Sequence, residues 1–106
     1  MFEGAVLRSV PVEAYQAAVE LATKNALTAA RLLVASSERI KGILNLTVYI
    51  LAEPEFTAHA RLADFASAYL QREIGEEGIG CRAAVGVASL PGNAPIEIQL
   101  VAIVAR

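Results

Sequence analysis

The chain has 106 residues, enough for one hydrophobic core, and we expect a single domain over residues 1–106. Hydrophobic residues make up 56% of the chain and charged residues 19%, a composition that excludes disorder. The chain has nine basic and eleven acidic residues and no basic cluster, which argues against nucleic-acid binding as the main task. Charges interrupt every long apolar run, so we expect no membrane binding, and a single cysteine allows no internal disulfide, which agrees with a cytoplasmic protein. The high apolar content indicates that other copies of the chain cover some of its surface.

The first half of the chain predicts a short strand followed by a long helix. Residues 4–8 are a brief apolar run, and Ser9 and Pro11 then suit a helix start, which we expect to continue to about Ala35. Polar residues recur at three- and four-residue steps on one side of this helix. Its apolar side is predicted to consist of Tyr15, Val19, Ala22, Ala26, Ala30 and Leu33.

Residues 43–52 alternate as a strand does, with Leu44, Leu46, Val48 and Ile50 predicted to share one face. A second helix follows, with the acidic residues Glu53 and Glu55 at its start, and a glycine-rich loop over 75–80 ends it. Strands over 81–90 and 96–104 are predicted to pair as a hairpin. The order predicts an α+β protein, a two-layer sandwich in which two helices cover one face of a mixed β-sheet and the other face becomes an interface.

The predicted hairpin carries two charged residues that a sheet does not require. A turn at 91–94 would place Arg82, Gly86, Glu97 and Gln99 on one face, with Gly86 leaving room between the charges. A guanidinium can hold a carboxylate in two parallel hydrogen bonds, and Glu97 could hold a water. The alternative is that Arg82 and Glu97 are ordinary charges on a solvated sheet face, whether or not they pair across it.

Other chemistry-bearing residues stand alone. His59, the single histidine, has no Cys or Asp at ligand spacing, so we expect no metal site and interpret it as a surface or interface residue. Cys81 is interpreted as a core residue, since neighbours along a strand point to opposite faces and free cysteines are often buried. The sequence has no nucleophile elbow and no phosphate-binding loop before a helix, so triad hydrolases and nucleotide enzymes are not indicated.

Two segments of the predicted hairpin carry a recognisable signature: Cys-Arg-Ala-Ala-Val-Gly-Val-Ala-Ser-Leu-Pro at residues 81–91 and Asn-Ala-Pro-Ile-Glu-Ile at residues 93–98. They closely resemble the C-terminal signature of the reactive intermediate deaminase (Rid) family, also called the YjgF or L-PSP endoribonuclease family. The resemblance extends over nearly the whole chain. It implies a chorismate-mutase-like fold, a homotrimer with ligand clefts between subunits, and cofactor-independent hydrolysis of enamines and imines derived from amino acids to 2-oxo acids and ammonia.

By this resemblance, Arg82 binds the substrate carboxylate and Glu97 is the catalytic residue that positions the attacking water. Ala84 and Gly86 take substrate-binding positions beside Arg82, although many active members have a cysteine where Ala84 stands. Members also usually begin with two further strands, and this chain starts after them. Either its start is truncated or misassigned, or the protein lacks a full cleft.

Two functions follow as expectations. The first is an imine or enamine deaminase that acts on small carboxylates without a cofactor. The second is a non-catalytic oligomer that binds small carboxylates or a protein partner, which the alanine at position 84 and the missing strands favour. A ribonuclease is suggested only by the family's name, because neither the charge nor the residues indicate one.

Overall fold

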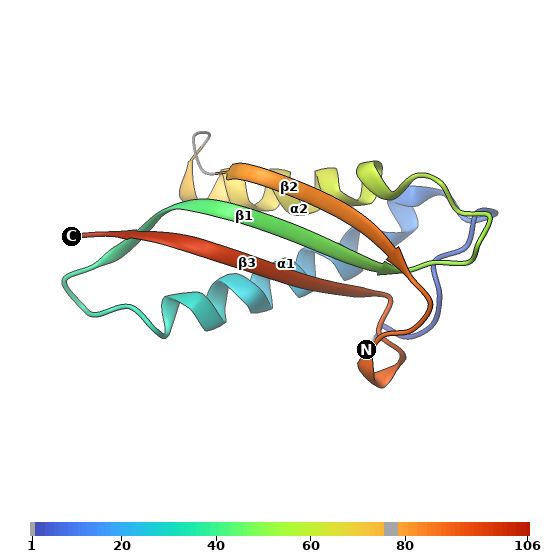
Figure 1. Ribbon diagram of the computed structural model, residues 1–106, viewed down its shortest axis with the longest axis horizontal. Helices are drawn as coiled ribbons and strands as arrows, with labels where there is room; N and C mark the ends of the chain where they lie inside the picture. Colours follow the sequence, from blue (N-terminus) through green and yellow to red (C-terminus); the bar gives the residue numbers. More distant parts are fainter. Residues whose placement is uncertain (1, 76–78) are drawn as a thin grey trace.

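Two helices lie side by side across one face of a sheet that has three strands in the described part of the chain (Figure 1). The structure is a computed structural model that describes residues 2–75 and 79–106. Its elements in chain order are the 3-10 turn η1 (Val12–Tyr15), α1 (Gln16–Arg31), β1 (Arg39–Leu51), α2 (His59–Ile74), β2 (Ile79–Val87), the 3-10 turn η3 (Pro91–Asn93) and β3 (Ile96–Ala105). The predicted α+β sandwich with a mixed sheet is confirmed.

The strand order β2-β1-β3 shows that the predicted hairpin is wrong. β1 lies in the middle, parallel to β2 and antiparallel to β3, so β2 and β3 do not pair with each other. β1 is long and apolar, and it gains hydrogen-bonded neighbours on both edges in this arrangement. Helix α2 carries the chain to one edge of β1, and residues 88–95 then carry it past the end of β1 to the other edge (Figure 1).

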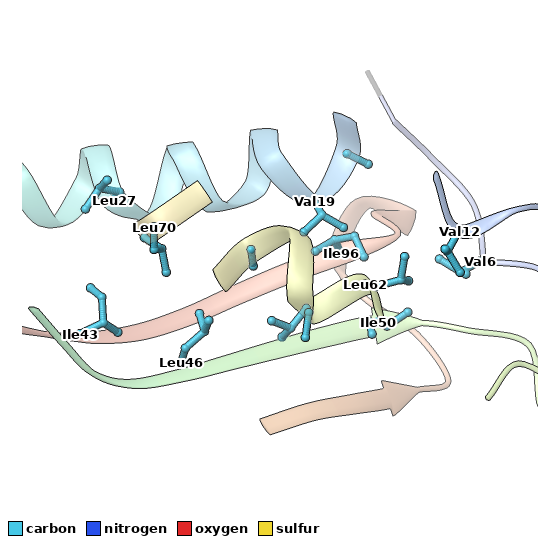
Figure 2. Close-up of a cluster of buried hydrophobic side chains, with 14 of the residues drawn as sticks. Val6, Val12, Val19, Leu27, Ile43, Leu46, Ile50, Leu62, Leu70 and Ile96 are labelled. Atoms are coloured by element: carbon cyan, nitrogen blue, oxygen red, sulfur yellow. The ribbon is translucent and has the colours of Figure 1, made fainter. Parts of the chain in front are cut away.

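The core fills the space between the sheet and the two helices (Figure 2). Leu46 and Ile50 of β1 are fully buried, as is Leu62 of α2, and Leu27 of α1 is almost so. Their alternation along β1 and their three- and four-residue spacing on the helices agree with the predicted pattern. The apolar faces of both helices therefore bury one face of the sheet and leave the other open.

One residue on the predicted apolar face of β1 is misplaced, because the strand contains an irregularity that the sequence pattern does not reveal. The pairing with β3 shifts register between Ile43 and Asn45. Ile43 is consequently buried in the core, whereas Leu44 is 56% exposed. The predicted set of Leu44, Leu46, Val48 and Ile50 is correct except for Leu44.

The first helix is shorter than predicted. It begins as the 3-10 turn η1 and ends at Arg31, so Leu33 is 88% exposed and does not belong to the apolar face. Thr23 is buried there instead, and its hydroxyl donates to the Val19 carbonyl at 2.7 Å. No helix in the described ranges is long and apolar enough to span a membrane.

Two short predicted segments also differ from the expectation. Residues 4–8 form no full strand but one parallel bridge, between Val6 and Ala52. Of the predicted loop over 75–80, residues 76–78 lie outside the described residues, and Ile79 already begins β2.

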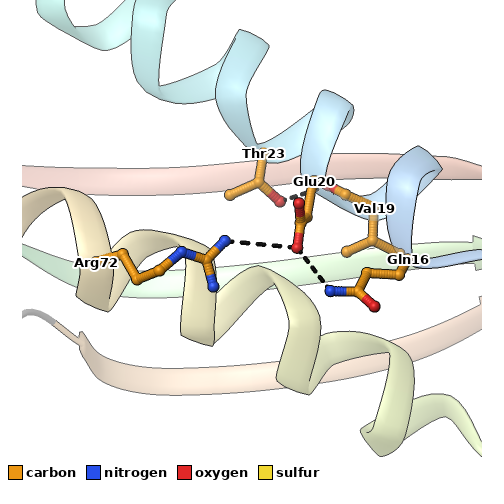
Figure 3. A network of polar contacts seen from close by, with 5 residues as sticks. All are labelled: Gln16, Val19, Glu20, Thr23 and Arg72. Atoms are coloured by element: carbon orange, nitrogen blue, oxygen red, sulfur yellow. Dashed lines mark hydrogen bonds and ion pairs between the residues drawn. The ribbon is translucent and has the colours of Figure 1, made fainter. Parts of the chain in front are cut away.

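Polar side chains join the two helices on their outer side (Figure 3). One carboxylate oxygen of Glu20 accepts hydrogen bonds from Gln16 on α1 at 2.9 Å and from Arg72 on α2 at 3.4 Å. Two further ion pairs, Arg31–Glu73 and Arg61–Glu13, also bridge the helix layer. Exposed pairs of this kind contribute little energy each, so the buried side chains hold the helices in place.

Candidate functional site

Arg82 lies on β2, which forms one edge of the sheet. It pairs with Leu46, so its side chain is on the face that the helices cover. Its Nη1 donates to Asp64 Oδ1 at 2.7 Å and to Ser67 Oγ at 3.1 Å, both on α2. The Arg82 side chain is 29% exposed and that of Asp64 is 65% exposed. The guanidinium is thus anchored at one end and still reached by solvent.

Glu97 lies on the opposite face of the sheet from Arg82. It pairs with Tyr49, and Gln99 pairs with Thr47, on the face that no helix covers. The Tyr49 hydroxyl donates to Gln99 Oε1 at 3.0 Å. The prediction that Arg82, Glu97 and Gln99 share one face is therefore wrong, because it assumed direct pairing of β2 with β3, whereas β1 separates them.

The separation of Arg82 and Glu97 can be estimated from the register. Two strand spacings of about 4.8 Å and three residues of about 3.3 Å along β1 give roughly 14 Å between their Cα atoms. A substrate of a few carbon atoms cannot contact both side chains of one chain across the sheet. The same distance excludes an ion pair between Arg82 and Glu97, and Arg82 pairs with Asp64 instead. Glu97 is exposed on the open face, as the alternative interpretation expected for that residue.

Ala84 and Gly86 lie on the helix-covered face with Arg82. Ala84 pairs with Val48 and packs partly buried against the core. Gly86 pairs with Ile50, and a Cβ atom at this position would lie 2.6 Å from Nε2 of His59. The predicted role of Gly86, leaving room between Arg82 and Glu97, is wrong, because the space is taken by the imidazole.

His59 is the residue whose position the sequence interpretation missed. It is the first residue of α2, half-buried, and its ring meets the Phe56 ring edge-on at 72° with 5.1 Å between centroids. A glycine inside an otherwise apolar strand often marks a close approach by another group, so Gly86 was the signal that could have indicated it. The interpretation of His59 as a surface or interface residue agrees with its partial exposure but did not include its contacts with Phe56 and Gly86.

Cys81 is exposed on the open face of the sheet beside Asn45, so its interpretation as a core residue is wrong. The alternation argument was correct, since Cys81 and Arg82 do point to opposite faces, but the face opposite Arg82 is the uncovered one. Within residues 2–75 and 79–106, no group of three or more His, Cys, Asp or Glu side chains could hold a metal ion.

The arrangement around Arg82 can bind a small carboxylate. Both hydrogen bonds that Arg82 makes within the described residues use Nη1, which leaves the donors on Nη2 and Nε for a ligand. A carboxylate accepts two parallel hydrogen bonds from such a fork. Asp64 already neutralises part of the charge, so a bound carboxylate has to compete with it.

The chain is similar in sequence and structure to several known proteins. No protein-family model matches the chain. Protein TCP17 of Trypanosoma cruzi is 32% identical to it over 92 residues, which cover 86% of this chain and 58% of that protein. The crystal structure of Atu1372 from Agrobacterium tumefaciens, a protein of unknown function, matches with a TM-score of 0.84 and 35% identity over 98% of this chain and 66% of the other.

A second solved structure, from Shewanella oneidensis MR-1, belongs to a protein described as a proposed endoribonuclease. It matches with a TM-score of 0.71 and 25% identity over 96% of this chain and 68% of the other. The chain thus spans less than two thirds of the Trypanosoma cruzi and Agrobacterium tumefaciens proteins. These similarities show a fold shared with these proteins and agree with the resemblance to the YjgF/L-PSP superfamily, but they do not single out its reactive intermediate deaminase group.

Proposed function

We propose that the protein is a cofactor-independent deaminase that hydrolyses small imine or enamine carboxylates to 2-oxo acids and ammonia. The observation that carries the proposal is the Arg82 guanidinium, which α2 anchors through Nη1 while its other donors stay available at the sheet edge. Arg82 also occupies the carboxylate-binding position in the resemblance to the deaminases. The substrate carboxylate binds the open side of the guanidinium, which fixes the position of the neighbouring imine carbon.

The reaction needs one water and no redox step. Water adds to the imine carbon and one of its protons passes to the nitrogen, which gives a carbinolamine. The proton of the new hydroxyl then passes to the nitrogen as the carbon–nitrogen bond breaks, so ammonia leaves and the 2-oxo acid remains. Glu97, which accepts a hydrogen bond from the water, orients it toward that carbon. An enamine enters the same path after protonation of its carbon gives the imine.

In this proposal Glu97 comes from a neighbouring copy of the chain, because roughly 14 Å separates it from Arg82 within one copy. The open face that carries Glu97 also exposes apolar side chains, among them Val85, Val101 and Ile103. Such a face is suited to contact with another subunit. A homotrimer with clefts between subunits agrees with this requirement.

The first test measures ammonia release from 2-iminobutyrate generated in situ, with and without the protein. We expect faster release with the protein, and a drop in kcat/KM of roughly a hundredfold or more for Arg82→Ala, because two charge-assisted hydrogen bonds are lost. Arg72→Ala is the matched control, since Arg72 is an exposed arginine of α2 that pairs with Glu20, and this variant should retain activity. Rates equal to the protein-free reaction would rule out the deaminase.

The second test asks whether two copies form each site. Arg82→Ala and Glu97→Gln chains are coexpressed, and mixed oligomers are assayed beside each homo-oligomer. We expect activity to return in the mixture, because some clefts then contain an intact Arg82 from one copy and an intact Glu97 from another. A mixture no more active than the average of the two variants contradicts a shared site.

The alternative function is a non-catalytic oligomer that binds small carboxylates. It is favoured by Ala84, whose methyl group packs against the core where many active relatives have a cysteine. Binding of 2-oxobutyrate that disappears in Arg82→Ala, together with no turnover of any imine tested, would identify this function in place of the deaminase.

A further inference from the structure

A cavity of about 600 Å³ opens beside the carboxyl ends of β1 and β2. Leu51, the last residue of β1, and Ala52 after it border the cavity on one side, and Val87, the last residue of β2, and Ala88 border it on the other. Small-molecule sites commonly occupy cavities of about 300–1,000 Å³, often beyond the carboxyl ends of parallel strands. Gly86, which also lines it, is four residues or roughly 13 Å from Arg82 along β2, so a small ligand here does not reach that guanidinium.

The lining combines an apolar wall with two polar side chains. Most of the lining residues, including Pro54 and Phe56, are apolar. The charged or ionisable side chains among them are Glu53 and His59, and the lining that the structure describes contains no lysine or arginine. The cavity therefore offers hydrogen-bond acceptors and a negative charge, but no positive partner for an anion.

Packing holds His59 in position beside the cavity. The Phe56 ring meets it edge-on, and Gly86 leaves the space that its imidazole occupies. Neither ring nitrogen has a hydrogen-bond partner among the residues that the structure describes. A neutral imidazole can accept one hydrogen bond, so His59 has a free acceptor to offer a ligand.

The N-terminal segment holds Glu53 through both its carboxylate and its backbone. Its Oε1 accepts the backbone N–H of Arg8, and its own backbone N–H donates to the Val6 carbonyl at 3.1 Å. Its Oε2 has no partner within residues 2–75 and 79–106. The carboxylate is thus positioned by one oxygen and available through the other.

We propose that this cavity binds a small primary amine in its ammonium form, with a compact hydrocarbon body. The ammonium group pairs with Glu53 Oε2 and donates a second hydrogen bond to the His59 imidazole, while the hydrocarbon lies against Pro54 and Phe56. A carboxylate of the same shape is rejected, because it would face Glu53 in a cavity whose described lining contains no cation. The site differs in place and in charge preference from the one around Arg82.

Three ligands of equal ring size test the charge preference by isothermal titration calorimetry: cyclohexylamine, cyclohexanol and cyclohexanecarboxylate. We expect the amine to bind most tightly. Glu53→Gln should weaken amine binding roughly tenfold, because a hydrogen bond to a charged group is lost while an acceptor for Arg8 remains. Glu55→Gln, an exposed carboxylate two residues away that does not line the cavity, is the matched control and should leave affinity unchanged.

A double-mutant cycle tests the role of His59. Gly86→Ala places a methyl group against Nε2 and should move the ring and weaken amine binding, but the same substitution in a His59→Ala chain should have no further effect. Thermal unfolding of each variant checks that it is folded. Arg82→Ala should bind the amine like the parent, so the outcome is separate from the deaminase test.

The proposal is overturned by any of three results. The carboxylate could bind as tightly as the amine, Glu53→Gln could bind like Glu55→Gln, or Gly86→Ala could weaken binding equally with and without His59. Each of these would mean that the cavity does not select an ammonium group through Glu53 and His59.

Discussion

At the scale of single residues, the pairing of Arg82 with Asp64 determines which donors of the guanidinium remain for the ligand of the proposed site. The sequence resemblance indicates Arg82, but nothing in the sequence indicates its partners, because Asp64 and Ser67 lie on a different element and meet Arg82 only after α2 packs beside β2. Asp64 holds the guanidinium in place and also competes for it. The affinity for a carboxylate should therefore depend on Asp64 in a definite direction.

Asp64→Asn is expected to tighten binding of 2-oxobutyrate by about two- to fivefold. The substitution removes a surface ion pair worth up to about 1 kcal/mol, so Arg82 no longer has to exchange one carboxylate for another. Isothermal titration calorimetry measures the change, and Glu13→Gln, which breaks the exposed pair with Arg61 away from this edge, should have no effect. Weaker binding by Asp64→Asn would mean that Asp64 orients Arg82 more than it competes.

At the scale of the elements, the irregularity in β1 decides which of two neighbouring leucines enters the core. Alternation in the sequence treats Leu44 and Leu46 alike, because they are two residues apart in a strand. The register shift between Ile43 and Asn45 turns Leu44 outward and leaves Leu46 fully buried. A bulge of this kind depends on the pairing with β3, so the sequence of β1 alone does not reveal it.

Alanine substitution of the two leucines should therefore have unequal effects on the free energy of unfolding. Leu46→Ala should lower it by about 2–5 kcal/mol, because a cavity remains in the core. Leu44→Ala should change it by no more than about 0.5 kcal/mol. Urea unfolding followed by circular dichroism measures both, and equal losses would contradict the observed register.

At the scale of the whole molecule, the uncovered sheet face determines whether the chain can act alone. Both helices lie on one side of the sheet (Figure 1), and the other side exposes Val85, Val101 and Ile103 around a polar centre of Thr47 and Tyr49. The same face carries Glu97. The proposed deaminase needs this face to meet another copy, so its activity and its assembly should be lost together.

Val101→Glu is expected to reduce the proposed oligomer to monomers, because it places a charge on an apolar surface that a second copy covers in the proposal. Sedimentation velocity measures the mass. Leu33→Glu serves as a control, since Leu33 is also an exposed apolar residue, at 88% against 46% for Val101, but lies beyond the end of α1. An unchanged mass for Val101→Glu would mean that copies do not meet through this face.

The sequence by itself determined the α+β class, both helices and the long strand β1, because these depend on hydrophobic periodicity, and a local signature made Arg82 a candidate for ligand binding. Only the tertiary structure decided that β1 lies between β2 and β3, since strand order depends on how distant segments pack and not on the pattern within each strand. That order places Arg82 and Glu97 on opposite faces and brings His59 against Gly86. A local pattern shows which residues alternate, but only long-range pairing determines which face they share.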